Sequence, residues 1–141
     1  MTLISTAPDI SGLDAPMDAW TRPFWEAAEG GQLLLPRCGE CRRFRWPPGP
    51  FCRHCQSQNT EWLAPGRPRL YSFTVIPASR GADESRVHVP ALVEFADAAG
   101  IHLPAAIVDT PISALQIGAA LVLGWAQARN VKVPVFTIAG Q

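Results

Sequence analysis

The 141-residue sequence predicts a mainly β protein, in which one short helix and a metal-binding ribbon precede a small barrel or sandwich. Three observations predict this class. All four cysteines fall into two C-x-x-C pairs separated by ten residues. The second half of the chain holds five runs rich in apolar and β-branched residues, with turn signals between them. The 14 prolines and 11 glycines favour many turns over a helical bundle.

The N-terminal part of the chain is expected to hold a tail and a helix. Residues 1–15 show no periodicity, so we expect a flexible tail there. Residues 16–31 are predicted to contain the short N-terminal helix. Thr21 can cap this helix, and Pro23 suits its first turn because the missing N–H would have no partner there. Two glycines end it at residue 30, since Gly tolerates the left-handed conformation that follows a helix.

Residues 32–66 are predicted to form a small ribbon around the two cysteine pairs. A short strand over residues 33–35 leads into the first pair, and another over residues 44–46 separates the two pairs. A third over residues 61–63 follows the second pair, before Pro65 and the adjoining Gly end the ribbon.

The cysteine pattern predicts one structural zinc ion. Two thiolates three positions apart can point at one ion, and two such knuckles complete the tetrahedron that zinc prefers. The metal ligands are therefore Cys38, Cys41, Cys52 and Cys55. Iron in a rubredoxin-type electron carrier is the alternative metal, but a Gly usually follows each knuckle there, whereas Arg42 and Gln56 stand here. Four thiolates leave no open coordination position, so the site is expected to stabilise the fold rather than catalyse a reaction.

Residues 67–141 change to all-β character. The strongest predicted strand covers residues 70–76, and a polar loop follows over residues 77–89. Tyr71 and Phe73 lie two apart, so a regular strand would place both side chains on one face. Four more strands are predicted, over residues 91–95, 101–108, 120–126 and 133–138. Five strands in this segment indicate a small closed barrel or a sandwich.

The beginning of the chain carries no recognisable targeting signal. It lacks a basic region followed by a long apolar run, and no stretch approaches the length of a membrane-spanning helix. We therefore expect a cytoplasmic protein with no membrane association. Cysteines stay reduced in that compartment, which favours metal binding over disulfides.

An ordered set of short motifs resembles one known family over residues 20–138. The motifs are Phe24-Trp25-Glu26, Gly31-Gln32-Leu33, the two C-x-x-C pairs, Pro47-Pro48, Glu61-Trp62, Tyr71-Ser72-Phe73-Thr74-Val75, Leu92-Val93-Glu94 and Ile117-Gly118. The family was long catalogued as domain of unknown function 35. The resemblance implies an N-terminal helix, a rubredoxin-like zinc ribbon and a five-stranded OB-fold barrel. Pro68 and Ala91 depart from the family pattern, near the predicted barrel.

The same resemblance implies a function. Such proteins are similar to zinc-binding accessory or scaffold subunits that associate with a thiolase-like or ketosynthase-like enzyme. The partner enzymes act on acyl-CoA thioesters in acyltransferase, aldolase or hydratase complexes of lipid metabolism and supply the catalytic residues. The resemblance therefore implies a hetero-oligomer, with acyl-CoA as a ligand that the small subunit could help to bind.

Aromatic and basic residues near the ribbon are the candidate partner- or ligand-binding residues. On the helix these are Trp20, Phe24 and Trp25, which could dock a partner or pack back onto the barrel. Five arginines surround the cysteines, at positions 37, 42, 43, 45 and 53. Arg42 and Arg43 could bind CoA phosphates or an acidic partner surface. Compensation of the −2 charge of a zinc ion with four thiolates is the alternative role of these arginines.

No catalytic residue is predicted. The sequence contains no G-x-S-x-G motif, no fifth cysteine and no Gly-rich phosphate loop. A nucleic-acid-binding ribbon and barrel is a second hypothesis, but residues 70–141 contain four basic against five acidic residues, and nucleic-acid binding depends on positive charge. A self-sufficient acyl-transfer enzyme is the third.

Overall fold

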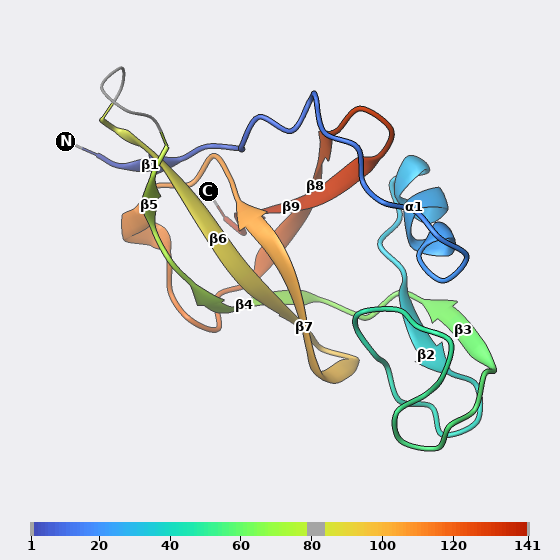
Figure 1. Ribbon diagram of the computed structural model, residues 1–141. Helices are drawn as coiled ribbons and strands as arrows, with labels where there is room; N and C mark the ends of the chain where they lie inside the picture. The colour runs from blue at the N-terminus through green and yellow to red at the C-terminus, as the bar shows by residue number, and fades with distance from the viewer. Residues whose placement is uncertain (1, 79–83, 141) are drawn as a thin grey trace.

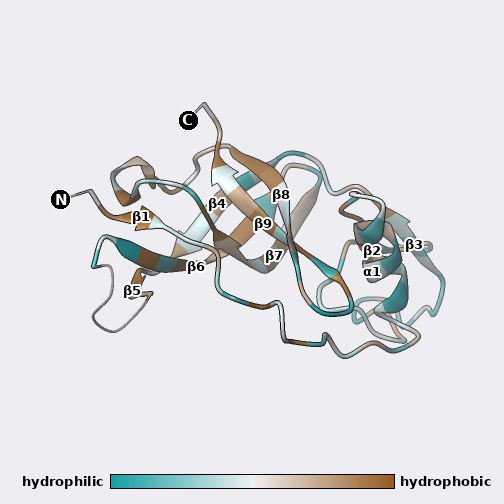
Figure 2. Cartoon of the chain, turned by 90° about the horizontal axis from the view of Figure 1, so that it is seen from above, coloured by the Kyte–Doolittle hydropathy of each residue, from teal (hydrophilic) through white to brown (hydrophobic). Residues whose placement is uncertain are grey.

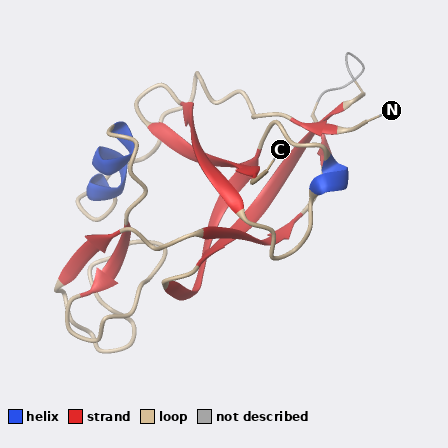
Figure 3. Cartoon of the chain, turned by 180° about the vertical axis from the view of Figure 1, so that it is seen from behind, coloured by secondary structure: helices blue, strands red, loops and turns tan. Residues whose placement is uncertain are grey.

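The computed structural model describes residues 2–78 and 84–140, and its mainly β architecture with a short helix and a four-cysteine ribbon confirms the predicted fold class. The elements in chain order are β1 (Ile4–Ser5), α1 (Arg22–Glu29), β2 (Leu35–Cys38), β3 (Thr60–Leu63), β4 (Pro68–Phe73), β5 (Ile76–Pro77), β6 (Arg86–Phe95), β7 (Ala98–Ile107), the 3₁₀ turn η1 (Ile112–Ala114), β8 (Leu121–Gln127) and β9 (Lys132–Ile138). The ribbon and α1 lie at one end of the molecule, and both chain termini lie towards the other end (Figures 1 and 3).

Seven strands form the large sheet, and β6 lies at its centre. β6 pairs antiparallel with β4, β5 and β7, while β7 pairs in parallel with β9, which is antiparallel to β8. The path β4-β6-β7-β9-β8 returns towards its first strand through one bridge between Arg69 and Ala120. The amide of Leu70 donates to the carbonyl of Ala119 over 2.9 Å beside this bridge. β4 and β8 are thus joined by a short contact rather than by a ladder.

The core forms because the long strands alternate between apolar residues that face inwards and more exposed ones. Along β6 every second side chain is buried, at Val87, Val89, Ala91, Val93 and Phe95. Hydrophobic colours accordingly run along the strands of the sheet in Figure 2, whereas much of α1 is hydrophilic. The same cluster of buried residues includes Phe24 from α1 and Leu35 from the ribbon. The helix and ribbon therefore share one core with the sheet.

Three elements of the structure differ from those that the sequence predicts. Residues 86–90 belong to β6 rather than to a loop, because they pair with β1, β5 and β7; residues 79–83 of the predicted loop lie outside the described residues. Residues 44–46 make only one bridge, between Phe44 and Arg37. A bulge between Leu70 and Ser72 interrupts the alternation of β4. Tyr71 is therefore exposed, whereas Phe73 packs against the core, so the two do not share a face as predicted.

Part of the segment predicted as a flexible tail, residues 1–15, forms a strand in the structure. Ile4 and Ser5 form β1, which pairs in parallel with Arg86 and Val87 of β6. Ser5 is fully buried, and its hydroxyl accepts a hydrogen bond from the amide of Thr110 over 3.0 Å. Two residues carry no periodicity, so only the tertiary structure reveals this strand.

The N-terminus of α1 is also held differently from the prediction. Thr21 is the N-cap residue, but its side chain makes no capping hydrogen bond to the helix. Instead, the Asp18 carboxylate accepts the amides of Trp20 and Thr21, and the Thr21 hydroxyl accepts the amide of Asp18. This turn fixes the entry of the chain into the helix, which begins at Arg22 and has Pro23 in its first turn.

Candidate metal centre

Two similar turns present the four cysteines. Cys38 ends β2, and the amide of Arg42 donates to its carbonyl over 3.0 Å. The amide of Gln56 donates to the carbonyl of Cys52 in the same way, over 2.8 Å. Arg42 and Gln56 adopt left-handed backbone conformations, with φ angles of 67° and 65°. Rubredoxin-type knuckles usually have a Gly at this position of the turn. Here Arg42 and Gln56 occupy it instead.

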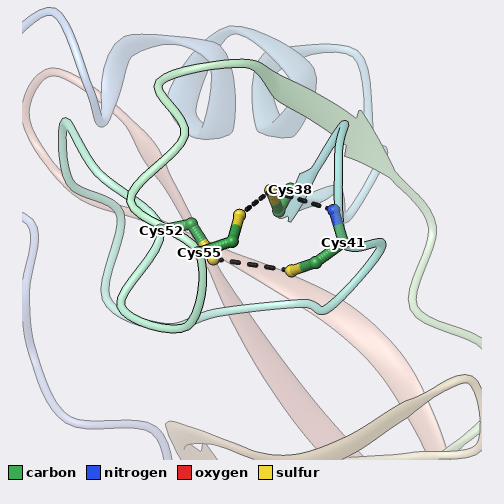
Figure 4. A group of neighbouring side chains, drawn as sticks. All are labelled: Cys38, Cys41, Cys52 and Cys55. Carbon is green, nitrogen blue, oxygen red and sulfur yellow. Dashed lines mark hydrogen bonds between the residues drawn. The ribbon is translucent and has the colours of Figure 1, made fainter.

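The sulfur atoms converge on one point (Figure 4). All four lie within 4.8 Å of one another, with Cys38 and Cys55 separated by 3.5 Å and Cys41 and Cys52 by 3.6 Å. A tetrahedron with Zn–S bonds of about 2.3 Å has edges of about 3.8 Å. The four-cysteine cluster therefore fits a tetrahedral zinc ion and forms the site of a zinc ribbon.

Backbone amides favour the charged form of Cys38 and Cys52, because their hydrogen bonds lower the pKa of both thiols. The amides of Glu40 and Cys41 donate to Cys38 Sγ, and the amide of His54 donates to Cys52 Sγ, each over 3.4 Å. The hydrogen bond from Cys41 is the main cause that lowers the pKa of Cys38 to about 6. Thiolates are the form that binds zinc, so the knuckle is preorganised for the metal.

The surroundings separate the five arginines into two groups. Arg37 forms an ion pair with Glu61 across the ribbon, at 2.7 Å, which lowers the pKa of that carboxyl group. Arg45 is buried and donates through Nη2 to the carbonyl of Gly49 and the hydroxyl of Thr60. Both therefore stabilise the ribbon. The other three, Arg42, Arg43 and Arg53, are exposed and line a hollow beside the metal site.

The three aromatic residues near α1 have different environments. Trp20 is 49% exposed, Trp25 is partly buried against the core, and Phe24 is only 4% exposed. Phe24 packs edge-on against Trp25 at 4.8 Å and lies 5.0 Å from the ring of Trp46. The structure therefore leaves Trp20 available for a partner, while Phe24 attaches the helix to the core.

The rings of the three histidines each contact a different kind of group: a guanidinium group, a backbone carbonyl and an aromatic ring. Nδ1 of His54 lies 2.7 Å from Arg43, and Nδ1 of His88 lies 3.2 Å from the carbonyl of Thr6. His102 stacks on Tyr71, with ring centres 3.8 Å apart. Sequence reasoning missed this pair, because Tyr71 reaches the exposed face only through the bulge in β4.

The described part of the chain contains no helix that is long and apolar enough to cross a membrane. This finding agrees with the absence of a long apolar run in the sequence.

Known proteins are similar to this chain, both in the zinc ribbon and over most of its length. Residues 25–61 match the model of the family described as "ChsH2, rubredoxin-like zinc ribbon domain". The chain is 34% identical over 116 residues to the "Probable enoyl-CoA hydratase alpha subunit" of Thermomonospora curvata. That match covers 80% of this chain but only 36% of the relative, so the chain spans about a third of the length of that protein.

Solved structures agree with this assignment. A chain of the structure described as "Ltp2-ChsH2(DUF35) aldolase" is 32% identical, with a TM-score of 0.75, and the match covers 89% of this chain and 99% of that one. A DUF35-family protein of unknown function from Sulfolobus solfataricus shares the fold at 16% identity, with a TM-score of 0.59 and 83% of each chain covered. The present chain therefore belongs to the ChsH2/DUF35 family and carries the rubredoxin-like zinc ribbon of that family.

Proposed function

We propose that this chain is a zinc-binding accessory subunit of a thiolase-like enzyme that acts on acyl-CoA thioesters, and that the partner supplies the catalytic residues. The observation that carries the proposal is the match to nearly the whole ChsH2 chain of the Ltp2–ChsH2 aldolase, at 32% identity. The similarity to an enoyl-CoA hydratase subunit supports the same class of substrate.

The structure offers physical support for an accessory role. The zinc site is made of four cysteines, which leave no coordination position for a substrate. The rings of the three histidines contact Arg43, the carbonyl of Thr6 and the ring of Tyr71, respectively, and the cysteines next to His54 are metal ligands. Trp20, exposed next to the ribbon, offers the large aromatic side chain that is enriched at the centres of protein interfaces.

The test is to purify the tagged, zinc-loaded chain from its native host and to identify what accompanies it by mass spectrometry. We expect a thiolase-like or ketosynthase-like protein in near-equal amount, and acyl-CoA turnover by the complex but not by the chain alone. Recovery of the chain without such a protein, or turnover by the isolated chain, would contradict the proposal.

A further inference from the structure

β8 has one edge that no strand among the described residues covers. It pairs with β9 over its whole length, from Leu121 to Gln127, and stands last in the path of paired strands in the large sheet (Figure 1). On its other side the ladder to β4 is reduced to the bridge between Arg69 and Ala120, just before β8 begins. The edge of β8 beyond that bridge is therefore open in the single chain.

The hydrogen bonds at the start of β8 show which of its residues face the open edge. The amide of Ala139 donates to the carbonyl of Ala120 over 3.0 Å, so residue 120 bonds towards β9. Because hydrogen-bonded and non-bonded pairs alternate along antiparallel strands, the even-numbered residues of β8 bond to β9. The backbone groups of Leu123 and Trp125 point to the other side, and no described residue bonds them.

The sequence of β8 does not protect this edge from pairing. Its seven residues, LVLGWAQ, include neither a charged residue nor a proline, which are the residues that natural proteins use to keep edge strands apart. Other edges of the same sheet have them: β4 begins with Pro68 and Arg69, and β5 ends at Pro77. Val122 is 51% exposed, and each later residue of β8 is at least partly exposed. The edge can therefore receive an extended strand.

The same sequence is suited to pair with a second copy of itself. In an antiparallel pair centred on Gly124, Leu123 of one chain would lie opposite Trp125 of the other, and the two would exchange hydrogen bonds. Gly124 would face its own copy at a position without such bonds, where the Cα atoms approach to about 4.5 Å. No like charges would meet across this pair.

Gly124 is not required by the fold of the single chain. It is not among the glycines with a positive φ, and a Cβ atom at this position would lie 3.6 Å from Cγ2 of Val135, an ordinary van der Waals distance. A glycine inside a strand weakens the strand, and it often marks a place where another backbone approaches closely. The centre of an intermolecular strand pair is such a place.

We propose that β8 is a homodimer interface, at which two copies of this chain pair their β8 edges antiparallel across a two-fold axis. The sheet then continues from one subunit into the other. An isologous contact of this kind covers the open edge of both copies at once, so the assembly stops at the dimer. The inference concerns the association of this chain with itself and does not rest on the proposed function.

Sedimentation velocity of the zinc-loaded full chain over a series of concentrations measures the dimer, and hydrogen exchange followed by NMR locates it. We expect a dimer that dissociates on dilution. The amides of Leu123 and Trp125 should exchange at least about tenfold more slowly in the dimer, whereas those of Val122 and Gly124 bond to β9 in either state and should change little. A monomer at all concentrations, or a dimer that leaves residues 123 and 125 unprotected, would overturn the proposal.

Gly124→Lys tests the centre of the interface. It should raise the dissociation constant of the dimer at least about tenfold, because two ammonium groups would meet at the two-fold axis. Thr137→Lys is the matched control: Thr137 lies opposite Val122 on β9, so the same charge is added to the same face one strand away from the edge. Bound zinc and cooperative melting show that each variant is folded. Equal dissociation constants for the two variants would contradict the proposed interface.

The remaining occupant of the edge is a strand from another protein. If the unchanged chain stays monomeric, and G124K no longer recovers the co-purifying enzyme whereas T137K does, the edge binds that enzyme and the present inference is wrong. If the chain dimerises as expected but purifies without a thiolase-like protein, only the proposed function fails.

Discussion

Arg42 and Gln56 show how single residues shape the metal site. Each follows the second cysteine of its knuckle and adopts the left-handed conformation, which costs an L-residue with a side chain about 1–2 kcal/mol. The knuckle needs this conformation because the amide of residue 42 or 56 must reach back to the carbonyl of Cys38 or Cys52. Arg42 and Gln56 therefore hold strained backbone conformations that the positions of the cysteine ligands require.

Replacing Gln56 by Gly should stabilise the zinc-loaded chain by about 0.5–1 kcal/mol, because Gly adopts a positive φ without the steric penalty. Urea or thermal unfolding measures the change. Gln58→Gly is the matched control, since Gln58 is also exposed but has no positive φ. The explanation fails if the two variants have the same stability.

The cysteine ligands should make zinc affinity depend on pH. The amide of Ser57 lowers the pKa of Cys55, but the neighbouring Cys38 thiol and burial raise it more, to about 11. The pKa of Cys38 is about 6. Above pH 6 Cys38 has already lost its proton, whereas Cys55 must still release one when zinc binds. Between pH 7 and 9 we therefore expect affinity to rise about tenfold per unit for each proton released.

Competition with a chromophoric chelator at several pH values measures this affinity. A constant affinity between pH 7 and 9 would show that all four thiols are ionised before the metal arrives.

Two short features, the strand β1 and the bulge in β4, determine contacts between distant parts of the chain. β1 contains two residues, yet it places Ser5 in the core and joins the N-terminal segment to β6 and to the segment around Thr110. The bulge in β4 adds one residue to a strand and turns Tyr71 outwards onto His102. Both features depend on pairing between distant segments, so neither has a local signature.

Ser5→Ala should reduce the free energy of unfolding by about 1–3 kcal/mol, because it leaves the buried amide of Thr110 without its acceptor. Denaturant unfolding measures the loss. Ser11→Ala is the control, since Ser11 is exposed and, among the described residues, forms its side-chain hydrogen bond with the nearby Asp9. An S5A chain as stable as S11A would mean that water reaches the Thr110 amide.

Across the whole molecule, one core connects the metal ribbon to the sheet. Phe24 and Leu35 belong to the same cluster as Val93, Leu103 and Phe136. A ribbon of this size has little core of its own, so metal binding supplies part of the free energy that keeps its residues in that cluster. We therefore expect zinc to influence the stability of the sheet, which it does not touch.

Removal of zinc by a strong chelator at neutral pH should lower the melting temperature of the sheet as well as unfold the ribbon. Circular dichroism at a β-sheet wavelength follows the sheet. Tryptophan fluorescence follows the ribbon in a W20F/W25F/W125F chain, which keeps Trp46 and Trp62 of the ribbon. Added zinc should restore both signals. If the sheet melts at the same temperature with and without zinc, the ribbon and sheet are energetically independent.

Trp20→Ala should weaken association with the co-purifying enzyme about tenfold or more, because an exposed Trp at an interface contributes more than most residues. Surface plasmon resonance with the recovered partner measures the affinity. Ile117→Ala is the control, since Ile117 is also exposed but lies between η1 and β8. Equal affinities for the two variants would place the interface elsewhere.

The sequence by itself determined the zinc ligands, the mainly β class and the family. Each depends on local patterns: the spacing within C-x-x-C pairs, the alternation along strands and the order of short motifs. The tertiary structure alone decided that Ile4 and Ser5 form a strand and that Phe24 is buried while Trp20 is exposed. It also decided that three arginines of the ribbon line one hollow together with residues from the hairpin of β6 and β7. These features arise from packing between segments far apart in the chain, and local spacing carries no information about which distant surfaces will meet.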